Sequence, residues 1–237
     1  MADNRLIVAL DVPTRTRADA LVAALGDSVS HYKVGMEFFY SEGGAIVRDL
    51  RAQGKEVFLD LKLHDIPNTV AHGLGALARL GASMLNVHAS GGYAMMKAAK
   101  EHLDAEADKA GVPRPQLIAV TVLTSMGADE WQKLGMTAPV ESQVVRLARL
   151  AQSAGLDGVV ASPREAAAIR AACGENFRIV TPGVRPAWAA VNDQSRIATP
   201  KDALASGATH LVVGRPITAA DDPRAAALRI LEEMGAQ

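Results

Sequence analysis

The densest group of side chains that could do chemistry lies at residues 60–69, where the sequence reads DLKLHDIPNT. Because side chains alternate along a strand, Asp60 and Lys62 are predicted to share one face of it. Two more charged residues, Asp11 and Lys33, lie on or just after other strand-like segments. Charges gathered at one place are costly to desolvate unless they pair, and alternating acids and bases would pair them and hold the central lysine rigidly. Such a lysine could stabilise negative charge that develops in a reaction. An ion-pair network that only closes the end of a barrel is the alternative.

A second candidate site combines two arginine-containing segments near the end of the sequence. The segment VVGRP places Gly214, whose backbone N–H can approach a ligand closely, before Arg215. An arginine can grip a phosphate through two hydrogen bonds. The long, aperiodic connection Gly183–Ser195 supplies Arg185 and Gln194, which also suit an anion. Together these segments predict a phosphate site beneath a lid, and a plain turn into the last helix is the alternative for VVGRP.

The elements that must position these residues are eight short apolar runs, which alternate with longer segments of helical pattern. Each run is almost continuously hydrophobic, as is typical of a strand buried on both faces of a parallel sheet. We predict strands at Leu6–Leu10, Tyr32–Val34, Val57–Leu61, Met84–Val87, Leu117–Val122, Gly158–Ala161, Arg178–Thr181 and His210–Val213.

The number and spacing of these runs predict an α/β fold, the (β/α)8 TIM barrel. About 30 residues per strand–helix unit, repeated eight times, fits the length of such a barrel, whose active sites form at the carboxyl ends of the strands. A doubly wound open sheet is the structural alternative, but no glycine-rich dinucleotide turn follows the first strand. The sequence contains no evident linker or low-complexity stretch, so residues 1–237 are expected to form a single domain.

Helix-capping patterns mark several of the intervening segments. Ser162–Glu165 (SPRE) predicts a helix with a capping serine and proline at its first position, and Thr199–Asp202 (TPKD) repeats this logic. Gly207 is expected to close the second of these helices. Apolar residues along one face predict a further helix over Glu141–Ala154.

Composition excludes several classes of partner. The chain has 49% apolar and 22% charged residues and a net charge of -1, so no global field attracts it to nucleic acid or to a membrane surface. No apolar stretch approaches the roughly 20 residues of a membrane span. The single cysteine, Cys173, cannot form an internal disulfide, and the first residues do not resemble a signal peptide. A cytoplasmic protein is therefore expected.

The motifs together resemble the orotidine 5'-phosphate decarboxylase family. Beside DLKLHDIPNT, the resemblance is carried by six shorter motifs in the expected order. These are ALDV, YKVG, VHASGG, TVLTS, TPGVRP and VGRPI. They cover essentially the whole chain, and we find no departure at a position that the family uses for chemistry.

The resemblance implies a role for each candidate residue. Lys62 would be the catalytic lysine, which delivers a proton to C6 of the pyrimidine as carbon dioxide leaves. Asp60 and Asp65 would flank it, and Lys33 would complete the alternating network. The implied substrate-binding residues are Asp11 and Lys33 for the ribose hydroxyls, Thr124 for the pyrimidine edge, Pro182 beside the base, and Arg185, Gln194, Gly214 and Arg215 for the 5'-phosphate.

The resemblance also implies a homodimer and a reaction without metal or cofactor. Asp65, Ile66 and Thr69 would reach into the active site of the partner subunit, giving two shared sites. Direct decarboxylation leaves a carbanion in the plane of the ring, where the π system cannot delocalise it. Most decarboxylases borrow an electron sink for this purpose, whereas here the charges of the protein would have to stabilise it.

Two alternative functions remain open. One is a magnesium-dependent sugar-phosphate lyase on the same barrel, a group that shares an Asp-x-Lys-x-x-Asp core. The continuation Ile66–Thr69, and Lys33 in place of an acidic metal ligand, argue against it. The other is a non-catalytic sensor of phosphate ligands, whose mark would be the loss of a catalytic residue, but Lys62 is present.

Overall fold

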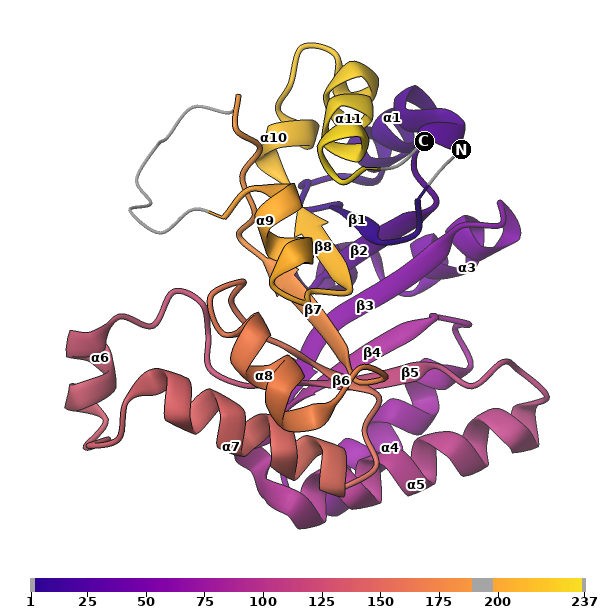
Figure 1. Cartoon of the computed structure of the whole chain (residues 1–237). Coiled ribbons are helices and arrows are strands. Elements are labelled where there is room, and N and C mark those ends of the chain that lie inside the picture. The colour runs from indigo at the N-terminus through magenta and orange to yellow at the C-terminus, as the bar shows by residue number, and fades with distance from the viewer. Residues whose placement is uncertain (1–2, 189–197, 236–237) are drawn as a thin grey trace.

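The computed structural model describes residues 3–188 and 198–235. In these residues, eight parallel strands close a barrel in chain order (Figure 1). The strands are β1 (Leu6–Ala9), β2 (His31–Gly35), β3 (Glu56–Leu63), β4 (Met84–His88), β5 (Gln116–Val120), β6 (Gly158–Val160), β7 (Arg178–Pro182) and β8 (His210–Val213). β1 pairs with both β2 and β8, which closes the barrel. The predicted (β/α)8 fold is confirmed, and each strand lies close to its expected bounds.

The barrel encloses an apolar core of its own. Its buried members come from six of the strands: Ile7, Ala9, Phe58, Met84, Ile118, Val180 and Val212. The opposite faces of the strands pack with the helices in a second, larger cluster. Because most of the strands are covered by apolar groups on both faces, their sequences are continuously hydrophobic rather than alternating.

Helices follow the strands and surround the barrel (Figure 1). They are α1 (Arg15–Leu25), α2 (Met36–Glu42), α3 (Ala45–Ala52), α4 (Pro67–Ala78), α5 (Gly92–Ala110), α6 (Ala128–Lys133), α7 (Val140–Ser153), α8 (Ala166–Cys173), α9 (Pro200–Ala205), α10 (Arg215–Thr218) and α11 (Pro223–Glu233). The α4 and α5 helices pack along each other, and α1 contacts α11. In the described part of the chain, no helix is both long and apolar enough to span a membrane.

The helix starts agree with the capping patterns in one case and differ in another. Thr199 caps α9, because its side chain accepts the Asp202 N–H at 3.1 Å. The α8 helix, by contrast, begins at Ala166 and not directly after Ser162. The Ser162 side chain accepts the Arg164 N–H at 3.3 Å and so closes a separate turn. A serine hydroxyl can stabilise such a local turn instead of a helix end, which is why the predicted start was too early.

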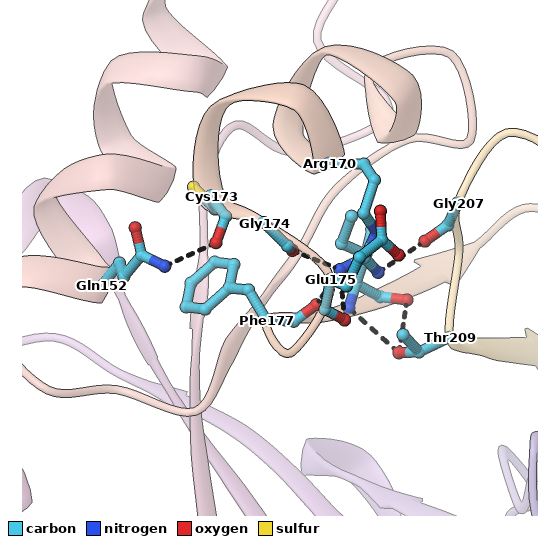
Figure 2. A network of polar contacts seen from close by, with 9 residues as sticks. Gln152, Arg170, Cys173, Gly174, Glu175, Phe177, Gly207 and Thr209 are labelled. Atoms are coloured by element: carbon cyan, nitrogen blue, oxygen red, sulfur yellow. Dashed lines mark hydrogen bonds and ion pairs between the residues drawn. The ribbon is translucent and has the colours of Figure 1, made fainter.

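Arg170 on α8 ties together two turns on the side of the barrel where the strands begin (Figure 2). Its Nη1 donates to the carbonyl groups of Gly174, Glu175 and Phe177 at 2.6–2.8 Å. Its Nη2 donates to the carbonyl group of Gly207 at 2.8 Å. These turns lead into β7 and β8, so hydrogen bonds from one charged donor anchor both strands at the ends opposite to their arginine-containing loops.

Candidate active site

A chain of alternating charges crosses the barrel mouth from β1 to β3. Lys62 Nζ donates to Asp60 Oδ1 at 2.7 Å. Lys33 Nζ lies 3.5 Å from the other oxygen of Asp60 and donates to Asp11 Oδ1 at 2.8 Å. The structure therefore brings together the four charged residues that strand positions alone had placed at one mouth. Each ammonium faces at least one carboxylate, so the desolvation of these charges is offset by pairing.

The β3 strand departs from regular geometry where it carries Lys62. Lys62 has a φ of 52°, in the left-handed region that favours glycine. The pairing of β3 with β4 shifts register between Leu59 and Leu63. Asp60 and Lys62 thus meet through an irregular backbone, not through the simple alternation of a regular strand. Backbone strain of this kind gathers at functional sites, where surrounding contacts hold it in place.

Asn86 on β4 contacts both members of this pair and was missed by the sequence analysis. Its Oδ1 accepts the backbone N–H of Lys62 at 2.8 Å, and its Nδ2 donates to Asp60 Oδ1 at 2.7 Å. The available signal was a single amide inside the apolar strand Met84–His88. A buried polar side chain needs partners, so its position invited the question of which groups it bonds.

Burial and charge act in opposite directions on the Asp60 carboxyl. Its side chain is 11% exposed, and the Lys33 side chain is 10% exposed. Burial alone would raise the pKa of Asp60, but the nearby ammonium groups of Lys33 and Lys62 bring this pKa below its ordinary value. Asp60 is therefore ionised at neutral pH and holds Lys62 electrostatically.

His88, at the end of β4, lies near the same charges. Burial lowers the pKa of His88, and the charges of His64 and Lys62 lower it further. The His64 and His88 rings pack with their centroids 5.4 Å apart. A neutral His88 adds no second positive charge beside Lys62.

The residues predicted to enter the partner's active site lie just after β3 and in the first turn of α4. Asp65, Ile66 and Thr69 are all exposed, and 66% of the Ile66 surface is open to solvent. The Asp65 side chain accepts the backbone N–H of Ile66 at 2.6 Å. No ion pair joins Asp65 to Lys62 within the described residues of this single chain. The predicted position of Asp65 beside a lysine is therefore not met inside one subunit.

Arg185 and Arg215 form a positive region after β7 and β8. Burial lowers the pKa of Arg185, and the positive charge of Arg215 lowers it further. Among the described residues, neither arginine forms an ion pair with a carboxylate. Gly214 precedes Arg215 and caps the short helix α10. The fourth predicted phosphate ligand, Gln194, and residues 189–195 of the predicted lid lie outside the described residues.

Thr124 and Pro182 line a cavity of about 670 Å³ at the ends of β5, β6 and β7. Ser125, Ser162 and Gly183 contribute to its wall. Lys62 and the other paired charges are not part of this lining. The cavity, the charge chain and the two arginines nevertheless occupy the carboxyl ends of neighbouring barrel strands, which is where barrel enzymes bind their substrates. No three His, Cys, Asp or Glu side chains are grouped to hold a metal ion in residues 3–188 and 198–235.

Comparisons with known proteins agree over nearly the whole chain. The model of the orotidine 5'-phosphate decarboxylase / HUMPS family matches residues 4–230. The orotidine 5'-phosphate decarboxylase of Moorella thermoacetica is 54% identical over 98% of this chain and 93% of its own length. That of Alkalilimnicola ehrlichii is 52% identical over 100% of this chain and 99% of its own. The crystal structure of orotidine 5'-phosphate decarboxylase from Lactobacillus acidophilus superposes with a TM-score of 0.87 at 43% identity, covering 99% of this chain and 100% of that one. This chain belongs to the orotidine 5'-phosphate decarboxylase / HUMPS family.

Proposed function

We propose that this protein decarboxylates orotidine 5'-phosphate to uridine 5'-monophosphate and carbon dioxide, the last step of de novo synthesis of that nucleotide. The observation that carries the proposal is the Lys62 ammonium, which is held by Asp60 at 2.7 Å at the mouth of the barrel. Relatives that are about half identical over their full length bear the name of this activity.

The reaction asks for a fixed positive charge beside one carbon atom. When the bond between C6 and the carboxylate carbon breaks, carbon dioxide leaves and C6 keeps the electron pair in the plane of the ring. The Lys62 ammonium stabilises this carbanion without having to reorganise, because Asp60 already holds it. A proton then moves from Lys62 Nζ to C6, and the lysine regains a proton from solvent. No metal or cofactor takes part in this scheme.

The other candidate residues bind the rest of the nucleotide. Asp11 and Lys33, which pair at 2.8 Å, bind the ribose hydroxyls. Thr124 recognises the pyrimidine edge and Pro182 packs beside the base at the cavity wall. The 5'-phosphate is held by Arg185, Gln194, Gly214 and Arg215. The positive charge of Arg215 already acts on Arg185, and a phosphate that accepts hydrogen bonds from both guanidinium groups would offset this repulsion.

The protein acts as a twofold homodimer in this proposal. The exposed residues Asp65, Ile66 and Thr69 extend into the active site of the partner subunit, where Asp65 flanks the partner's Lys62 from the side opposite to Asp60. An isoleucine that is 66% exposed is costly in water and gains from burial against a second subunit.

We also propose that the protein works in the cytoplasm. Its lone cysteine, Cys173, suits that reducing compartment.

Mixing two inactive variants tests the shared site. K62A and D65N should each lose activity, but their heterodimer contains one site with both native residues. Random mixing makes half of the dimers heterodimers with one native site each, so about a quarter of the wild-type activity should return. The matched control is K62A mixed with D60N, since Asp60 and Lys62 come from one subunit and no native site can form. A mixture of K62A and D65N as inactive as the control would rule out the crossing of Asp65.

The activity itself is tested by following the loss of orotidine 5'-phosphate absorbance with purified protein in the presence of a chelator. Conversion to uridine 5'-monophosphate is expected at the same rate with and without chelator. Absence of turnover by folded, dimeric protein would overturn the proposal. If a sugar phosphate is consumed, and only with added magnesium, the protein is instead the magnesium-dependent sugar-phosphate lyase considered as an alternative from the sequence.

A further inference from the structure

Asn86 joins the two residues that the proposed reaction depends on most. Only 1% of its surface is exposed, and its amide group bonds to the Asp60 carboxylate and to the Lys62 backbone. We propose that Asn86 is a positioning residue, whose side chain fixes Asp60 and Lys62 relative to each other and so holds the ammonium at one point. This inference rests on the proposed decarboxylation.

The first reason is the backbone of Lys62. A left-handed φ of 52° is unfavourable for a residue with a side chain and persists only where other contacts impose it. The ladder between β3 and β4 is interrupted there, between Leu59 and Leu63. The Asn86 oxygen accepts the Lys62 N–H inside this interruption, at 2.8 Å. Asn86 can serve as an anchor because its own strand pairs regularly with β5, where it lies opposite Ile118.

The second reason is the orientation of the Asp60 carboxylate. Oδ1 accepts hydrogen bonds from both Lys62 Nζ and Asn86 Nδ2, each at 2.7 Å. Oδ2 is left to face Lys33 at 3.5 Å. Without the amide, the carboxylate could rotate and exchange its two oxygens between the two lysines. A neutral amide sets this orientation without adding charge to the network.

Replacement of Asn86 by alanine should therefore affect the chemical step rather than substrate binding. For N86A we expect kcat to fall about 100-fold, as is typical when a reacting group is misplaced by about 1 Å, with a much smaller change in KM. The matched control is T121V, just after β5, which removes the partly buried hydrogen bond from Thr121 Oγ1 to the Val160 carbonyl at 3.0 Å. T121V should keep its kcat even where its melting temperature falls as far as that of N86A.

A second variant distinguishes positioning from general support of the fold. N86D introduces a carboxyl group that faces Asp60 and Lys62 from β4, with Lys33 and His88 nearby. When protonated, this group can donate to Asp60 as the amide does; when ionised, it repels Asp60 and attracts the lysine. The ratio of N86D to wild-type kcat should therefore rise as the pH falls, by about tenfold per pH unit while the introduced group stays mostly ionised.

The outcomes separate this inference from the proposed function. If the wild-type protein fails to convert orotidine 5'-phosphate, the proposed function fails. If the wild type is active but N86A retains its kcat, or loses no more than T121V at equal loss of melting temperature, Asn86 is not a positioning residue. A ratio of N86D to wild-type kcat that stays flat between about pH 5.5 and 8 would also exclude this role. A rising ratio together with a selective loss of kcat in N86A supports it.

Discussion

Replacing Lys62 with alanine is expected to lower kcat by roughly 10⁴- to 10⁷-fold, the largest effect of any single substitution in this chain. This range combines two roles: stabilisation of developing charge, typically about 10²–10³, and proton transfer, about 10²–10⁴. Both roles need an ammonium at the position where Asp60 now holds it at 2.7 Å. The measurement is single-turnover conversion of orotidine 5'-phosphate, which is sensitive enough for slow variants.

The loss in K62A should not come from unfolding. Asp60 keeps a second partner, because Lys33 Nζ lies 3.5 Å away, so its carboxylate is not left buried without a positive charge. We therefore expect K62A to bind uridine 5'-monophosphate and to melt near the wild-type temperature. Lys97, which is exposed on α5, provides the matched control, and K97A should behave as the wild type in all three measurements. A K62A variant with kcat within about tenfold of the wild type would remove Lys62 from the mechanism.

The barrel could be predicted from the sequence because burial on both faces makes its strand sequences continuously hydrophobic. Runs such as Leu6–Ala9 on β1 are buried along their whole length, and continuous apolar strands separated by helices leave few alternative folds. The same logic brought Asp11, Lys33 and Asp60 together, since parallel strands end at one mouth. Position along a strand was sufficient for these three residues.

Details that depend on contacts between strands could not be predicted. The left-handed backbone at Lys62 and the register shift beside it arise from the pairing of β3 with β4, and a single strand pattern carries no record of that pairing. Asn86 was missed for the same reason, because its importance comes from which groups it reaches. The surroundings of Asp65 could not be tested in one chain, where it is exposed, because its proposed partner is Lys62 of another subunit.

Replacing Arg215 with alanine is expected to lower kcat/KM by roughly 10²- to 10⁴-fold, because two charge-assisted hydrogen bonds to the phosphate are worth about 1.5–3 kcal/mol each. Part of this loss should fall on kcat. The phosphate is remote from C6, but its binding can drive the closure of the predicted lid at residues 183–195, and energy from remote binding then appears in the chemical step. Steady-state kinetics with orotidine 5'-phosphate separate the two parameters.

The substrate without its phosphate makes this prediction specific. Orotidine cannot use the positive region at Arg185 and Arg215, so R215A and the wild type should convert it equally slowly. R185A should show the same pattern. The double variant R185A/R215A should lose less kcat/KM than the product of the two single losses, because both arginines are proposed to hold one anion. The control is R146A, in an exposed position on α7, which should leave both substrates unaffected. If R215A raises KM and leaves kcat unchanged, phosphate binding anchors the nucleotide and adds nothing to the chemical step, which would contradict the predicted lid.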